Sequence, residues 1–254
     1  MPANQPSPSR AWRGLPAAAA AMLMLSAAPA QAAATTAAAN EPPGLDTSAP
    51  LRALAQHDGL VTDEARTVPA CAWSVLAHLA NGSTMRSGPG RDAIKRQVLW
   101  LRTTQDELGR FAPNGAPCAV FDQTIAAWAM VSAWGLSNYK LLEANAARAV
   151  AAVEQAMLAP DGPPTGAELG AVLALLGEQY AFFGRTEPAR RITALARQAL
   201  AGQAFGKTRR GDAALHLAQM VLGETFLPEL TVARTWPGDL TADPLQTLFA
   251  VQAV

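Results

Sequence analysis

Alanine and leucine dominate the apolar residues of this chain, and that bias constrains its fold more than any other feature. The 254 residues include 57 Ala and 30 Leu but only 13 Val and 3 Ile. Ala and Leu lose little side-chain entropy in a helix, whereas β-branched residues favour strands. No strand-like alternation of apolar and polar residues is evident. The composition therefore predicts an all-α protein.

The charges balance over the whole chain, with 20 Lys and Arg against 20 Asp and Glu. Proteins that bind nucleic acids or membrane surfaces draw affinity from clustered basic residues, and the chain has no dense basic run. Because 50% of the residues are hydrophobic, disorder throughout is disfavoured. The charge balance therefore argues against a nucleic-acid binder. The chain length and the hydrophobic content favour one domain with a substantial core, or two small ones at most.

The first 32 residues have the pattern of a secretory signal peptide. Arg10 and Arg13 precede an apolar stretch over 15–25, which is followed by the small-residue site AQA ending at Ala32. The stretch is shorter than the roughly 20 residues that span a bilayer. We expect cleavage after Ala32, export to the periplasm or the exterior, and no transmembrane span in the mature chain.

Behind this leader, residues 33–60 predict a flexible linker rich in Ala, Thr and Pro, and residues 61–254 a helical domain. Apolar periodicity and Gly or Pro breaks predict helices at 68–81, 91–104, 120–136, 141–157, 165–183, 187–202, 211–224 and 242–253. In the second of these, Ile94, Val98 and Leu101 form a single apolar stripe, which is typical of an outer helix.

Helices with few charges alternate with one-sided helices, and this alternation indicates a repeat. The more buried ones begin near 68, 120, 165 and 212, at spacings of 52, 45 and 47 residues. Tetratricopeptide and ankyrin arrays repeat at about 34 and 33 residues and fit poorly, whereas HEAT-like solenoids and larger helix-pair repeats remain open.

One motif narrows this choice. The segment 91–111, RDAIKRQVLWLRTTQDELGRF, ends in Gln105, Gly109 and Phe111. This spacing resembles the tail of the repeat shared by squalene-hopene cyclases and the prenyltransferase and squalene oxidase repeat proteins, in which Gln, Gly and Trp close each helix pair. The resemblance covers about residues 61–254, with one good copy of the motif and several decayed ones.

The resemblance implies an α/α toroid or an incomplete toroidal arc, with parallel inner helices around a centre, and the alternative is a HEAT-like α-solenoid. Physically, Gln105 can bond free groups at a helix end, Gly109 permits a turn, and Phe111 fills the gap between helix pairs.

Enzymes of this superfamily carry motifs that the chain lacks. Class II terpene cyclases use an Asp-x-Asp-Asp acid, and protein prenyltransferases bind zinc through Asp, Cys and His. The acidic residues here are isolated from one another, and two Cys and three His have no zinc-ligand spacing. No serine elbow or phosphate loop occurs. We expect no catalytic residues, no metal and no cofactor.

Two sets of residues are candidates for further roles. Cys71 and Cys118 lie near the starts of adjacent predicted inner helices, so the sequence leaves open a disulfide or two separately buried thiols. In toroids ligands sit at the centre near inner-helix ends, and the candidate ligand-binding residues are Asp122, Gln123, Trp128, Glu168, Asp212 and His216. The alternative interpretation is that the carboxylates interact with helix dipoles and the tryptophans only pack.

We therefore expect an exported, non-catalytic helical-repeat domain that binds a protein, a glycan or another component of the cell envelope. The alternative is a terpene cyclase-like or prenyltransferase-like enzyme that acts on an isoprenoid. The predicted final helix, 242–253, has no outer partner, and its apolar edge (Phe249, Val251, Val254) would be covered by a partner or by self-association with a second copy.

Overall fold

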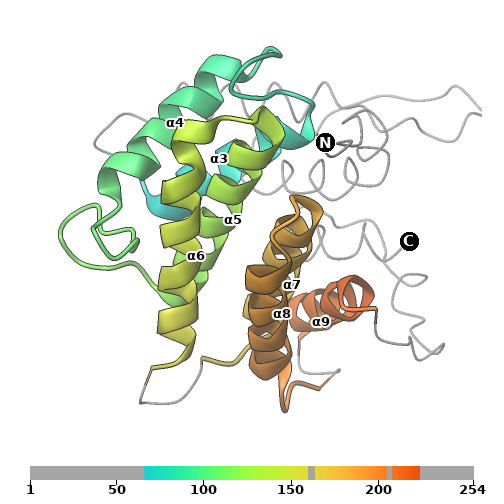
Figure 1. Cartoon of the computed structure of the whole chain (residues 1–254). Coiled ribbons are helices and arrows are strands. Elements are labelled where there is room, and N and C mark those ends of the chain that lie inside the picture. The colour runs from blue at the N-terminus through green and yellow to red at the C-terminus, as the bar shows by residue number, and fades with distance from the viewer. Residues whose placement is uncertain (1–65, 160–163, 205–207, 224–254) are drawn as a thin grey trace, which may run out of the picture.

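The computed structural model describes residues 66–159, 164–204 and 208–223, and this part of the chain is all-α, as the composition predicts (Figure 1). A single isolated antiparallel residue pair, Gln105 with Phe111, is the only β-type pairing among these residues. The helices are α3 (Val68–Ala80), α4 (Arg91–Thr104), α5 (Val120–Ser137), η3 (Lys140–Leu142, a 3-10 turn), α6 (Glu143–Met157), α7 (Ala167–Phe182), α8 (Thr186–Leu200) and α9 (Arg209–Val221).

The seven predicted helices that fall in this region are confirmed, with ends that differ by about three residues or less. The predicted signal peptide (1–32), the predicted linker (33–60) and the predicted final helix (242–253) lie outside the described residues, as does the apolar edge expected on that helix.

Local signals account for several of the helix ends. The Thr67 hydroxyl accepts a hydrogen bond from the Ala70 N–H, and the Thr208 hydroxyl accepts one from the Gly211 N–H, so side chains cap α3 and α9. At the C-terminal end of α5, Asn138 takes a left-handed conformation with φ of 45°, which Asn tolerates better than most residues. Polar capping residues thus set these boundaries in the sequence.

The helices pack in two layers. The inner layer is the row α3, α5, α7 and α9, in which each helix packs on the next. The outer layer consists of α4, α6 and α8, which pack on α3, α5 and α7 respectively. Figure 1 shows α6 in front of α5 and α8 in front of α7. The helices of the inner layer begin at 68, 120, 167 and 209, so each helix pair takes up between 42 and 52 residues, close to the predicted spacing.

Burial distinguishes the two layers. In α5 every residue from 123 to 133 is buried, because neighbouring helices surround it. In α4 the buried residues lie on one face, and the side chains of Ile94, Val98 and Leu101 are at most 1% exposed. Small Ala side chains allow the inner helices to approach closely. None of the helices in the described ranges is long and apolar enough to cross a membrane.

Candidate functional site

The segment after α4 forms a turn that joins two helix pairs, and Gln105 begins it. Gln105 is the C-cap residue of α4. Its Nε2 donates to the Asn145 carbonyl oxygen at 3.0 Å, and the Asn145 Nδ2 donates to Gln105 Oε1 at 2.7 Å. The end of α4 is therefore fixed to the start of α6 by a reciprocal pair of hydrogen bonds. We call residues 105–111 the closing turn.

Gly109 lies in the closing turn where no other residue fits well. Its φ is +86°, in the left-handed region that favours glycine, and a Cβ at this position would lie 2.1 Å from the Arg148 carbonyl oxygen. The turn thus passes directly against the backbone of α6. Phe111 follows with its side chain fully buried, at 0% exposed.

Gln123 holds the closing turn from the other side. Its side chain is 4% exposed, and Oε1 accepts from the Phe111 N–H at 2.9 Å. The Nε2 donates to the carbonyl oxygens of Gly109 at 3.1 Å and Ala149 at 3.3 Å. One amide on α5 therefore connects the turn, α5 and α6 through three hydrogen bonds to backbone groups.

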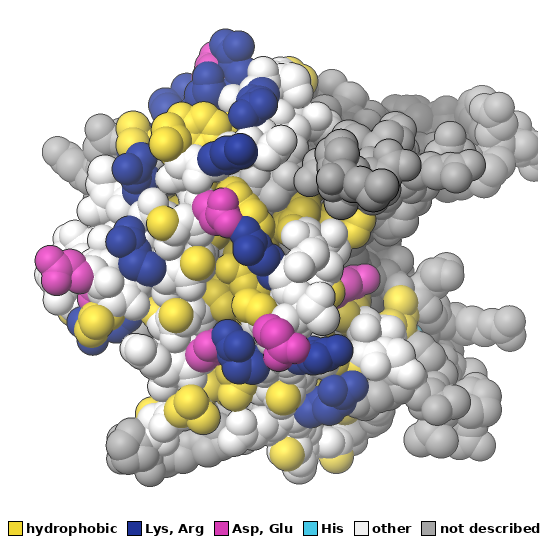
Figure 2. Space-filling view, in the orientation of Figure 1, with side chains coloured by type: hydrophobic (Ala, Val, Ile, Leu, Met, Phe, Trp, Pro, Cys, Tyr) yellow, Lys and Arg dark blue, Asp and Glu magenta, His cyan; other side chains and the backbone are white. Residues whose placement is uncertain are grey.

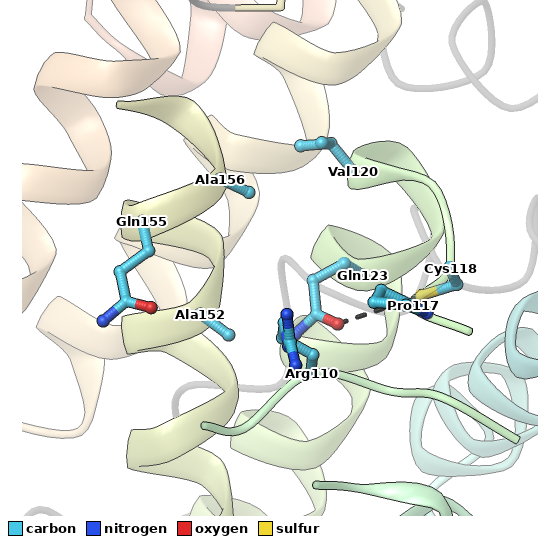
Figure 3. A pocket seen from close by; sticks show the side chains of 8 residues that line it. All are labelled: Arg110, Pro117, Cys118, Val120, Gln123, Ala152, Gln155 and Ala156. Atoms are coloured by element: carbon cyan, nitrogen blue, oxygen red, sulfur yellow. Dashed lines mark hydrogen bonds between the residues drawn. The ribbon is translucent and has the colours of Figure 1, made fainter. Parts of the chain in front are cut away.

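A pocket of about 240 Å³ lies between the closing turn, the start of α5 and α6 (Figure 3). In Figure 3 Ala152 and Ala156 point into it from α6, Gln123 and Arg110 lie beside each other, and the Gln155 side chain points away. Eight residues line it: Arg110, Pro117, Cys118, Val120, Gln123, Ala152, Gln155 and Ala156.

The polar groups of the pocket have little freedom for chemistry. The Arg110 Nε donates to the Asp106 carboxylate at 2.7 Å, and Gln123 is occupied by backbone groups. Burial, together with the negative charge of Asp122, raises the pKa of the Cys118 thiol to about 11. The thiol is therefore protonated at neutral pH and is a poor nucleophile.

The predicted ligand-binding residues do not converge on this pocket. Gln123 lines it, whereas the other five residues are not among its lining residues. Asp122, Glu168 and Asp212 lie in the first turns of α5, α7 and α9, where a carboxylate interacts favourably with the helix dipole. Burial raises the pKa of the Asp122 carboxyl.

Trp128 and His216 are buried within the inner layer, at 6% and 9% exposed. The Trp128 ring meets Trp73 of α3 edge to face, with centroids 6.5 Å apart. The position of Trp128 agrees with the packing interpretation of the tryptophans.

An aromatic group at the ends of α5 and α7 was not foreseen. Trp134 stacks edge to face on Tyr180 and Phe183, and the Arg185 guanidinium lies 5.3 Å from the Trp134 ring centroid. Arg185 also pairs with Glu143 of α6. The aromatic run at 180–185 is the sequence feature that could have indicated this group. Its partners, Trp134 and Glu143, lie more than forty residues earlier in the chain, so the run alone does not identify them.

The structure favours the alternative of two separate thiols over a disulfide. Neither Cys71 nor Cys118 is bonded in a disulfide in the structure. Cys71 is 1% exposed within the core, and the Cys118 thiol is directed at Gln123 Oε1, 3.8 Å away. Within the described ranges, no group of three or more His, Cys, Asp or Glu residues is placed to hold a metal ion.

A scan against protein-family models found no match for this chain, and searches of the curated proteins and of the solved structures also found none.

Proposed function

We propose that the protein is an exported, non-catalytic helical-repeat module that binds a component of the cell envelope. In this proposal it is a short member of the prenyltransferase and squalene oxidase repeat group. Its helix pairs form an α/α toroid or an incomplete toroidal arc, with a HEAT-like solenoid as the alternative. The signal-peptide pattern at 1–32 and the two-layer order of the helices support this proposal.

The observation that carries the non-catalytic assignment is the use of Gln123. It is a buried polar residue that lines the pocket beside the closing turn, and its amide forms hydrogen bonds with three backbone groups. The neighbouring thiol is protonated and the neighbouring guanidinium is paired. These side chains join helix pairs together, and joined pairs form an extended surface of the kind that helical-repeat proteins use for binding.

Export is tested by N-terminal sequencing of the protein recovered from the exported fraction of its source cells. We expect a mature chain that begins at Ala33. A chain that retains residues 1–32, or that stays inside the cells, would refute the export part of the proposal.

Binding is tested by a pull-down from envelope extract with the full chain as bait. The matched control is Gln123→Leu, which removes the joint between helix pairs but keeps the surface residues. We expect one or more envelope components on the native bait and far less on the control. Equal recovery on both baits would show that capture does not depend on the ordered array.

A second candidate, an enzyme acting on an isoprenoid, has one supporting observation. The half-buried Trp73 and the buried Trp128 form an aromatic pair in the inner layer, and aromatic walls suit an apolar ligand. Incubation with squalene or with prenyl diphosphates distinguishes the two. Turnover that the Trp128→Leu variant loses, while circular dichroism shows an intact fold, would replace the binding proposal with the enzymatic one.

A further inference from the structure

The outward face of α4 combines exposed cations with one protruding apolar side chain. Leu99 is 58% exposed, and Lys95, Arg96 and Arg102 are exposed on the same helix. These three residues lie four before, three before and three after Leu99, so a helix makes all of them its neighbours. Figure 2 shows dark blue and yellow side chains gathered together over α4, at the upper left. We call these four residues the α4 patch.

The cations of the α4 patch are available to an external partner. Lys95, Arg96 and Arg102 form no ion pair with any residue that the structure describes, whereas Arg91 nearby pairs with Asp92. Between residues 86 and 102 the chain has five Lys or Arg and one acidic residue. Arg86 lies before α4 and donates to the Asn138 carbonyl oxygen, so α4 itself carries four of these cations and one carboxylate, Asp92.

The α4 patch reopens the possibility of binding to a membrane surface, against which the overall charge balance argued. The sequence has no dense basic run, and that absence argued against binding to a membrane surface. A helix, however, brings residues three and four apart onto one face. The charge cluster is therefore a product of helical geometry, and it is visible once α4 is known to expose this side.

The combination of groups fits a lipid surface better than a soluble polyanion. Lys and Arg side chains bind lipid phosphates while their stems cover apolar surface. An apolar side chain among them, with the half-buried Trp100 beside it, can enter the boundary between headgroups and acyl chains. A soluble polyanion would use the cations but would leave Leu99 in water.

We infer that the α4 patch docks the protein onto the surface of a bilayer that contains anionic phospholipid. This inference names an envelope partner and in that respect rests on the proposed function. Binding to purified vesicles does not depend on export or on a protein partner. Failure of the vesicle test and failure of the proposed function are therefore separate results.

The test is co-sedimentation of the full chain with vesicles of phosphatidylcholine alone and of phosphatidylcholine mixed with phosphatidylglycerol. We expect binding to the anionic vesicles that exceeds binding to the neutral ones and that falls in about 0.5 M salt. The triple variant Lys95→Gln, Arg96→Gln, Arg102→Gln should weaken it about a hundredfold, at about fivefold per cation. Leu99→Ser should weaken it by about fivefold.

The matched control removes three cations from another outer helix, with Arg190→Gln, Arg191→Gln and Arg197→Gln on α8. This control lowers the net charge by the same amount as the α4 triple variant. It should bind vesicles within about twofold of the native chain. The apolar stretch at 15–25 is common to every variant and cancels in the comparison.

Three outcomes would overturn the inference. Neutral and anionic vesicles could bind equally, or the α8 control could lose as much binding as the α4 triple variant. In the third, the native protein binds heparin as tightly as vesicles and Leu99→Ser changes neither, which would indicate a soluble polyanion. Circular dichroism of each variant shows that a loss of binding is not a loss of fold.

Discussion

At the scale of single residues, Gly109 carries the tightest constraint in the closing turn. The change Gly109→Ala requires a left-handed backbone, which costs about 1 kcal/mol, and places a Cβ 2.1 Å from the Arg148 carbonyl oxygen. Because backbone on both sides must move, we expect the free energy of unfolding to fall by at least about 2 kcal/mol. Urea-induced unfolding of the native chain and of the variant measures this difference in the free energy of unfolding.

Gly115 is the matched control for this prediction, because it lies in the same connection between α4 and α5. Its φ is +79°, yet a Cβ there would meet nothing within 4 Å. Gly115→Ala should therefore cost only the conformational term of about 1 kcal/mol. Equal losses in the two variants would mean that the contact with α6 does not constrain the turn.

The Cys118 thiol provides a second residue-scale prediction, on pH dependence. Its pKa of about 11 leaves about a thousandth of it as thiolate at pH 8, against about a quarter for an ordinary thiol. In a Cys71→Ala background, alkylation by iodoacetamide should be at least about tenfold slower in the folded protein than in urea, even allowing for the greater reactivity of a basic thiolate.

The direction with pH follows from the raised pKa. Thiolate increases as pH rises, so the rate for the folded protein should still be climbing at pH 10, where the unfolded protein levels off. Asp122→Asn removes the neighbouring negative charge and should increase the rate at pH 8. A folded rate that levels off near pH 9 would contradict the assignment.

At the scale of elements, the amide pair between Gln105 and Asn145 joins successive outer helices. The single changes to Ala and the double change form a mutant cycle. We expect a coupling free energy of about 1 kcal/mol, because each side chain loses a partly buried partner. The exposed ion pair of Arg190 with Glu187, at 72% side-chain exposure each, is the comparison and should couple by less than about 0.5 kcal/mol.

The helices themselves were predictable from the sequence, and their contacts were not. The stripe of Ile94, Val98 and Leu101 is a local pattern, so it identified the buried face of α4 correctly. Gln123 appeared in the sequence as a ligand candidate beside Asp122. Its partners Phe111 and Ala149 lie 12 and 26 residues away, and only the packing of α5 against α6 reveals that it serves the fold.

The cysteines also show that the sequence predicts positions along helices but not contacts between side chains. Their positions near the starts of α3 and α5 were right to within a few residues, and adjacency of the two helices was right as well. A disulfide depends in addition on the direction of each Cβ–Sγ bond. Helical periodicity does not fix that direction for Cys118, which precedes the helix.

At the scale of the molecule, each inner helix packs on its neighbours in the row α3, α5, α7, α9, and α3, α5 and α7 each pack also on the outer helix that follows in the chain. The sequence order and the spatial order are the same, so most stabilising contacts are local along the chain. In arrays of this kind, stability is close to a sum of contributions from each unit and each interface. A weakened joint should then release one end of the array and leave the other intact.

Hydrogen exchange of the Gln123→Leu variant tests this view of the whole domain. The change leaves the buried Phe111 N–H without its acceptor, which costs about 2 kcal/mol. Amides in α3, α4 and α5 should exchange about 30-fold faster than in the native chain, while those in α7 and α8 should be unchanged. Gln155→Leu, on the exposed side of α6, should alter neither group. If protection instead falls equally in all helices, the domain unfolds as one cooperative unit, and the inner row must be held together by more than contacts between neighbours.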